Sequence, residues 1–193
     1  MSKDSLVHFI QSHLPVQEEI LEEIASHFEE KLFSRHDFFL QQGKVSDHYM
    51  YLEEGFMRAY TLDVDGNEVT TNFYTHNQVV FEVASFFNHI PSKEYIQAIT
   101  DCKGYMLTFK QLNLLFHSIP EFREFGRTIL VKGFVSLKQR TLSLINETAE
   151  ERYENLVRHH PSLFQHVPLK YIASYLGVTD TSLSRIRREY SKK

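Results

Sequence analysis

The last part of the chain carries a row of hydroxyl and guanidinium side chains at helical spacing. The row, which recurs at i, i+3, i+4 and i+7, consists of Thr181, Ser184, Arg185 and Arg188. Leu183 and Ile186 fall on the other side of the predicted helix. An outward arginine can bind a guanine edge bidentately in the major groove, and hydroxyl groups can reach bases or phosphates. The row therefore favours contact with double-stranded DNA.

We assign base readout to Arg185 because it lies in the N-terminal half of this helix. Ser184 belongs to the same DNA-binding face. Phosphate contacts that position the helix are expected from its neighbours: Thr179, Thr181, Ser182, Arg187, Arg188, Lys192 and Lys193. The plain alternative is a helical hairpin whose basic face is only solvated.

Residues 169–188 have the residue types of a helix-turn-helix. Ala173 is small where two helices must cross closely, and Gly177 occupies the tight turn, where glycine adopts positive φ without steric cost. Thr179 can cap the second helix, and Asp180 suits the positive end of its dipole. The apolar interior of the predicted pair is Ile172, Leu176, Val178, Leu183 and Ile186.

Charge is distributed unevenly along the chain. The net charge is −4, yet residues 167–193 contain six Lys or Arg against Asp180 and Glu189, which gives +4 and leaves −8 elsewhere. An acidic body with a basic end is typical of a protein that touches phosphate with one small module.

The segments upstream must position this module. Helical spacing predicts two short helices before residue 29, with Pro15 between them. From Phe33 to Phe109, aromatic and β-branched runs predict a compact β-roll with strands at 48–52, 56–62, 68–74, 95–100 and 105–109. Asp65-Gly66 predicts a type I′ hairpin turn, which needs positive φ at both central positions.

A proline-free stretch from Glu121 to Asn146 predicts one long helix, followed by a helix over 149–159. The long helix forms either a dimer seam or simple packing on its own roll. We therefore predict an α+β protein. Its parts are a β-roll of the double-stranded β-helix or jelly-roll type with flanking helices (1–118), a long dimerisation helix (119–147) and a small all-α helix-turn-helix domain (148–193).

The sequence lacks the residues that several other kinds of chemistry require. Cys102 is the single cysteine, which excludes an internal disulfide and an iron–sulfur cage within one chain. The 11 histidines include no His-x-His pair of the kind that cupin metal sites use. We predict no metal, no cofactor and no enzymatic activity. No apolar run reaches the roughly 20 residues of a membrane span, and the first residues do not resemble a signal peptide, so we expect a cytoplasmic protein without membrane contact.

The order of parts resembles the Crp/Fnr family of bacterial regulators over almost the whole length. The motifs that carry the resemblance are Gly55-Phe-Met-Arg-Ala-Tyr60, Asp65-Gly-Asn-Glu68, Thr148-Ala-Glu-Glu-Arg-Tyr153, Ile172-Ala-Ser-Tyr-Leu-Gly177 and Leu183-Ser-Arg-Ile186. The resemblance implies a homodimer through the long helix, a roll that senses an unknown small-molecule effector, and a palindromic DNA operator. RNA polymerase is a further candidate partner.

The roll departs from cyclic-nucleotide-binding members of that family. Those have a Gly-Glu-apolar step and then an Arg-Ser/Thr-Ala step whose arginine holds the phosphate; here the two read Phe81-Glu82-Val83 and Ser92-Lys93-Glu94. Glu94 repels a phosphate and Lys93 substitutes only weakly for arginine, so we predict no tight cyclic-nucleotide binding. The family usually continues into a β-hairpin wing, whereas this sequence stops at Lys193, which predicts fewer phosphate contacts.

The leading interpretation is a dimeric DNA-binding transcription regulator whose effector shifts the recognition helices through the long helix. Candidates for lining an effector cavity are Arg58, Tyr60, Phe73 and Glu82, although a roll filled by its own aromatic side chains is the alternative. Another class also fits the sequence: a sensor or adaptor module that binds a small molecule or a protein, with weak or no DNA binding. A cupin-like metalloenzyme is a remote third.

Overall fold

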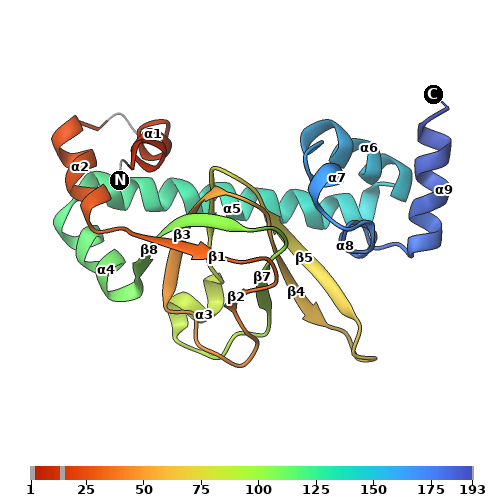
Figure 1. The fold of residues 1–193 in the computed structure, drawn as a ribbon, viewed down its shortest axis with the longest axis horizontal. Coiled ribbons are helices and arrows are strands. Elements are labelled where there is room, and N and C mark those ends of the chain that lie inside the picture. Colours follow the sequence, from red (N-terminus) through yellow and green to blue (C-terminus); the bar gives the residue numbers. More distant parts are fainter. Residues whose placement is uncertain (1–2, 14–15, 193) are drawn as a thin grey trace.

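The computed structural model describes residues 3–13 and 16–192, which form a central β-roll with helices at both ends (Figure 1). Lys193, a predicted phosphate contact, and Pro15, the predicted break between helices, lie outside the described residues. Two short helices precede the roll, as predicted: α1 (Asp4–Gln11) and α2 (Glu18–Ser26). Their apolar faces pack with residues of the roll and of the later helices in one continuous core.

The roll consists of two four-stranded antiparallel sheets. The first has the order β1 (Glu29–Phe33), β8 (Cys102–Thr108), β3 (His48–Glu54) and β6 (Gln78–Val80). The second has the order β2 (Phe38–Leu40), β7 (Tyr95–Ala98), β4 (Met57–Leu62) and β5 (Glu68–Tyr74). Apolar residues of both sheets, among them Met50, Met57 and Ile96, bury one another in the core.

All five predicted strand runs contain strands, but the roll starts earlier and has more strands than the sequence predicted. The roll was expected to begin at Phe33, whereas β1 begins at Glu29. The last strand was expected from residue 105, whereas β8 begins at Cys102. The edge strand β1 was missed because four of its five residues are exposed, which leaves no alternating apolar pattern. β2 and β6 have only three residues each, too few for a periodic signal.

The hairpin between β4 and β5 exists, but its predicted type I′ turn is wrong. Gly66 has a φ of 83°, whereas Asp65 is not among the residues of positive φ. The carboxylate of Asp63 accepts hydrogen bonds from the backbone N–H groups of Asp65 and Asn67, at 2.9 and 2.8 Å. These side-chain bonds favour a longer loop over the two-residue type I′ turn. In this loop Gly66 alone has a left-handed backbone conformation.

One long helix, α5 (Pro120–Asn146), runs past the roll and joins the two ends of the molecule (Figure 1). Its first part, with Phe122, Phe125 and Gly126, is buried against α4 (Phe109–Ser118) and the N-terminal helices. Past Ile129, most of its apolar side chains are exposed. Within the described residues, no helix is long and apolar enough to cross a membrane.

Four helices gather at the far end of α5: α6 (Ala149–His159), α7 (Leu163–His166), α8 (Leu169–Leu176) and α9 (Asp180–Tyr190). They share an apolar core to which the roll contributes Phe56, Phe73 and Ile99. Thr148 begins α6 with a capping box, in which its hydroxyl accepts the N–H of Glu151 while the Glu151 carboxylate accepts the N–H of Thr148. The remaining helix, α3 (Val83–Asn88), lies between β6 and β7.

Candidate nucleic-acid interface

A glycine turn connects α8 to α9, as the sequence predicted. Gly177 adopts a φ of 69°, in the left-handed region. Its N–H donates to the carbonyl of Ser174 at 3.1 Å, and the N–H of Val178 donates to the carbonyl of Ala173 at 3.0 Å. These bonds satisfy carbonyls that the end of α8 leaves unpaired, so the turn fixes the angle at which α9 departs.

Gly177→Ala is expected to destabilise this turn. A Cβ here meets only Leu144, at 3.8 Å, so the strain comes from the backbone conformation rather than from crowding. The left-handed conformation costs an L-residue roughly 1–2 kcal/mol, which corresponds to a melting temperature lower by about 3–6 °C. Gly177→Asn should lower it less, because asparagine tolerates this conformation better. Equal melting temperatures for all three proteins, measured by calorimetry, would contradict this account.

The second helix presents the predicted polar row to solvent. Leu183 and Ile186 are only 1% and 3% exposed, and both pack in the core of the C-terminal helices. Thr179 caps α9, since its hydroxyl accepts the N–H of Ser182 at 3.2 Å. The exposed members of the predicted set are Thr179, Thr181, Ser184, Arg185, Arg187 and Arg188, while Ser182 is half-buried and Lys192 is exposed.

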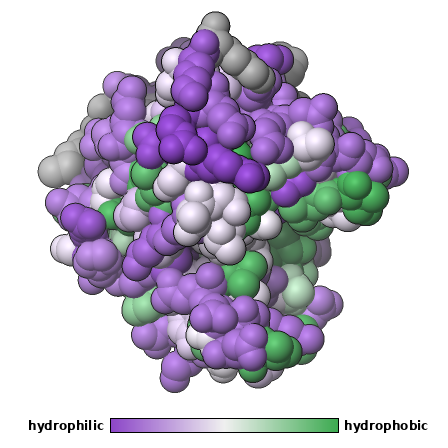
Figure 2. Space-filling model, turned by 90° about the vertical axis from the view of Figure 1, so that its right-hand side faces the viewer, coloured by the Kyte–Doolittle hydropathy of each residue, from purple (hydrophilic) through white to green (hydrophobic). Residues whose placement is uncertain are grey.

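The guanidinium groups on α9 are available to a partner. Within the described residues, Arg185, Arg187 and Arg188 form no ion pair with a carboxylate. Figure 2 views the molecule from the end that carries α6–α9, and hydrophilic side chains cover most of that face. α9 stands at the outer edge of the molecule in Figure 1, where none of the described residues covers its polar row.

Two arginines hold the end of α8 that leads into the turn. Arg152 of α6 donates to the carbonyl of Leu176 from Nε and Nη2, at 3.2 and 2.9 Å, and to the carbonyl of Glu147 from Nη1, at 2.6 Å. Arg140 of α5 donates to the carbonyl of Tyr175 at 3.1 Å. Cations at a helix C-terminus pair with its negative dipole end. The orientation of α9 is therefore tied to α5 and α6.

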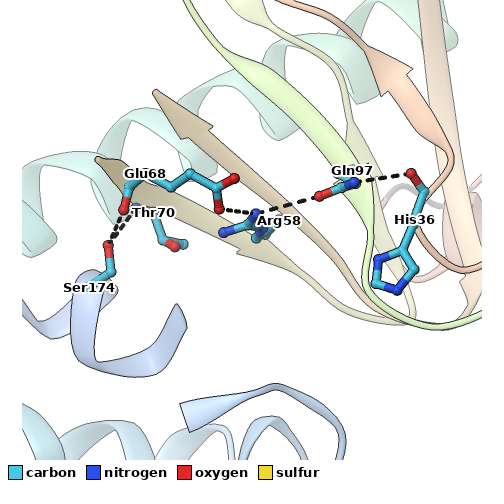
Figure 3. A network of polar contacts seen from close by, with 6 residues as sticks. All are labelled: His36, Arg58, Glu68, Thr70, Gln97 and Ser174. Carbon is cyan, nitrogen blue, oxygen red and sulfur yellow. Dashed lines mark hydrogen bonds and ion pairs between the residues drawn. The ribbon is translucent and has the colours of Figure 1, made fainter. Parts of the chain in front are cut away.

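The roll also contacts α8 directly, through β5 (Figure 3). The hydroxyl of Ser174 accepts the N–H of Thr70 at 2.8 Å and donates to the carbonyl of Glu68 at 3.2 Å. The rings of Phe73 and Tyr175 pack with centroids 5.0 Å apart. α8 thus packs against β5, the edge strand of the second sheet, and β5 connects the roll to the C-terminal helices.

Arg58 lies at the centre of this contact. Its guanidinium is sandwiched between the ring of Tyr60, 4.1 Å from the centroid, and the ring of Tyr171 of α8, 3.5 Å from the centroid. It pairs with Glu68, and Nη2 lies 3.4 Å from the amide oxygen of Gln97 (Figure 3). Arg58 is only 1% exposed, so the two rings and one carboxylate stabilise a charge that water does not reach.

The predicted effector residues are not brought together as a group. Arg58, Tyr60 and Phe73 lie at or beside the contact with α8, whereas Glu82 lies at the start of α3. There its carboxylate accepts the N–H groups of Ala84 and Ser85, at 3.0 and 2.7 Å. Within the described part of the chain, no three His, Cys, Asp or Glu side chains gather as metal ligands.

The arrangement of the roll, with α3 inserted between β6 and β7, can be compared with known domains. Residues 30–118 match the family model described as "Cyclic nucleotide-binding domain". The roll is therefore similar to cyclic nucleotide-binding domains. The chain matches no curated protein sequence.

Solved structures share the fold over most of the chain. CLP, the c-di-GMP-responsive global regulator of Xanthomonas campestris, has a TM-score of 0.72 at 14% identity, over 91% of this chain and 92% of its own. FixK2 from Bradyrhizobium japonicum has a TM-score of 0.72 at 15% identity, over 86% and 85%. A Eubacterium rectale protein described as a regulator of the Crp/Fnr family has 0.71 at 13%, over 93% and 88%. The fold therefore matches that of Crp/Fnr-type regulators.

Two acidic side chains of the roll, Glu82 and Glu94, lie close enough to interact electrostatically. Burial raises the pKa of the Glu94 carboxyl, and the nearby Glu82 carboxylate raises it further, against a hydrogen bond from Thr71 that lowers it. Lys93, the weak substitute for arginine, is exposed. A phosphate placed beside these carboxylates would be repelled, and weak binding of cyclic nucleotides stays a prediction.

Sequence reasoning missed Arg140, Tyr171 and Ser174, which connect α8 to the roll and to α5. A weak signal existed, because Tyr171 and Tyr175 recur at i, i+4 on α8 beside its buried apolar face. Such a half-buried aromatic pair is typical of a helix that packs against a second surface. The sequence alone did not say which surface that is.

Proposed function

We propose that the chain is a DNA-binding transcription regulator of Crp/Fnr type, in which α8 and α9 form the helix-turn-helix and α9 is the recognition helix. The observation that carries this proposal is the exposed row on α9, with guanidinium groups that no carboxylate of the described chain neutralises. Leu183 and Ile186 anchor the opposite face, so the row is held rigidly outward. The match of fold to regulators supports the same conclusion.

The functional form is a homodimer formed along α5. The exposed apolar residues of this helix, at 39–71% exposure, are Leu130, Val131, Phe134, Val135, Leu137, Leu142, Leu144 and Ile145. Leu130, Phe134, Leu137 and Thr141 follow the alternating four- and three-residue spacing of a coiled-coil seam. A soluble chain rarely leaves so long an apolar stripe in water, and two copies of it would bury each other.

Two connections carry a change in the roll to the recognition helix. One is α5, whose Arg140 donates to carbonyls of both Tyr175 and Thr70, at 3.1 and 3.4 Å. The other is the contact between β5 and α8 around Arg58. A ligand or a partner that shifts β5 relative to α5 must also reorient α8, which changes the spacing of the two recognition helices in a dimer.

DNA binding is tested with the full chain and labelled duplexes from its own upstream region, by fluorescence anisotropy over a range of salt concentrations. We expect a dissociation constant that rises steeply with salt, because each phosphate contact releases a counterion and contributes a slope of about 0.9 in log–log form. A palindromic duplex should bind more tightly than a scrambled one. Lack of binding to any duplex at low salt would favour the sensor or adaptor alternative.

Cyclic AMP and cyclic GMP are expected not to bind tightly. Calorimetric titration of the full chain should show no micromolar affinity, because the step Ser92-Lys93-Glu94 lacks an arginine that could hold the phosphate. The comparison variant is Glu94→Arg, which removes one carboxylate and adds a candidate partner for the phosphate. Micromolar binding by the unmodified chain would overturn this prediction.

A further inference from the structure

A recess separate from the DNA-contacting row lies where α5, α6 and α8 meet. Its volume is about 200 Å³, enough for a small organic molecule. The ring of Tyr175 and the side chains of Leu144 and Leu156 form apolar walls, and Arg140 and Arg152 lie on opposite helices around it. The recess borders α5 and α6, whose arginines bind the carbonyl groups at the end of α8.

Apart from the phenol of Tyr175, the ionisable groups that line the recess are all basic: Arg140, Arg152, His159 and His160. Within the described residues, neither arginine has a carboxylate within ion-pair distance, since their N–H groups bond to backbone carbonyls. The nearby Glu147 carboxylate is held by Ser143 at 2.5 Å and Asn155 at 3.2 Å. Two guanidinium charges therefore remain without a neutralising anion.

The two histidines add imidazole rings to the lining. The Nδ1 of His159 lies 2.8 Å from the carbonyl oxygen of Asn155. Burial, and then the neighbouring His159, lower the pKa of His160. Burial disfavours the charged form of an imidazole, so His160 offers the recess a hydrogen-bonding ring rather than a fixed positive charge.

We propose that this recess binds a small organic oxyanion, a carboxylate or phosphate on a short apolar body, as a second effector site outside the roll. The guanidinium groups would hold the oxyanion, while Tyr175 and the leucines would cover the apolar part. A DNA backbone fits less well, because the guanidinium of Arg140 is stacked on Tyr175, 3.7 Å from its centroid, and donates inward. A bound anion would stiffen the junction that sets the direction of α9.

The test is isothermal titration calorimetry of the full chain with inorganic phosphate, phenyl phosphate and benzoate at constant ionic strength. We expect at least one probe to bind with millimolar or better affinity, phenyl phosphate or benzoate more tightly than inorganic phosphate. Arg140→Met and the double variant His159→Gln/His160→Gln should each weaken binding about tenfold or more.

Two matched controls should bind like the unmodified chain. Arg127→Met removes an exposed arginine from the same helix, and His117→Gln removes a histidine whose Nδ1 also lies by the carbonyl four residues earlier, at 2.7 Å. If the double variant fails to fold, the comparison of Arg140→Met with Arg127→Met still tests the proposal. The proposal is overturned if no probe binds, if the variants bind like the controls, or if the variants weaken only DNA binding. Because the titration contains no DNA, its outcome does not depend on the proposed function.

Discussion

Replacing Arg185 by alanine is expected to weaken binding to the cognate duplex by roughly tenfold to a hundredfold. A bidentate contact between a guanidinium and a base contributes about 1–3 kcal/mol of discrimination. Arg185 is exposed, and its neighbours Leu183 and Ile186 hold the helix in place, so the substitution should leave the fold intact. Anisotropy titrations with cognate and scrambled duplexes measure the effect.

The comparison with Arg188→Ala separates base readout from phosphate contact. Arg185→Ala should reduce the preference for the cognate duplex, whereas Arg188→Ala should weaken both duplexes alike and lower the salt slope by about one. Arg127→Ala, on α5 and paired with Glu124, is the control for general loss of positive charge. An unchanged preference in the Arg185 variant would show that another residue reads the bases.

The double substitution Phe134→Glu/Leu137→Glu is expected to convert the proposed dimer to a monomer. Both side chains are exposed in the single chain, at 68% and 62%, and would be buried at the α5 seam. Losing their burial costs about 1.5–3 kcal/mol for each side chain, before charge repulsion between the new glutamates. A loss of 4 kcal/mol raises the dimer dissociation constant roughly a thousandfold.

Light scattering after size-exclusion chromatography measures the mass directly, and affinity for a palindromic duplex should fall with it because a monomer occupies one half-site. Leu114→Glu is the matched control, since Leu114 is an exposed leucine of α4, at 57%, outside the seam. A doubly substituted chain that stays dimeric would show that α5 is not the dimer interface. A chain that is monomeric without any substitution would do the same.

Local patterns predicted the C-terminal elements closely because each had its own signal. Gly177 marked the turn, Thr179 marked the start of the second helix, and the helix over 149–159 has the predicted bounds. The strands were harder, since β1 has a single buried residue and β2 and β6 are short. The Asp63 carboxylate changed the hairpin turn through bonds that dipeptide rules do not include.

The role of Arg58 shows why the site was only partly predictable. A basic residue among strand residues suggested a ligand inside the roll, whereas its partner is Tyr171, more than a hundred positions later in the chain. Both interpretations need the same local sequence, so only the three-dimensional arrangement distinguishes them. The exposed polar row on α9 needed no such information, because its periodicity lies within one helix.

The packing of Arg58 between Tyr60 and Tyr171 limits how freely the two ends of this molecule can be exchanged with those of other proteins. A chimera that grafts a foreign C-terminal region onto this roll would bury the guanidinium without its second ring and leave the Thr70 N–H and the Glu68 carbonyl without the hydroxyl of Ser174. Such a chimera is expected to be less stable than the parent chain. Engineers who wish to swap these regions should transfer Tyr171 and Ser174 along with the new helix.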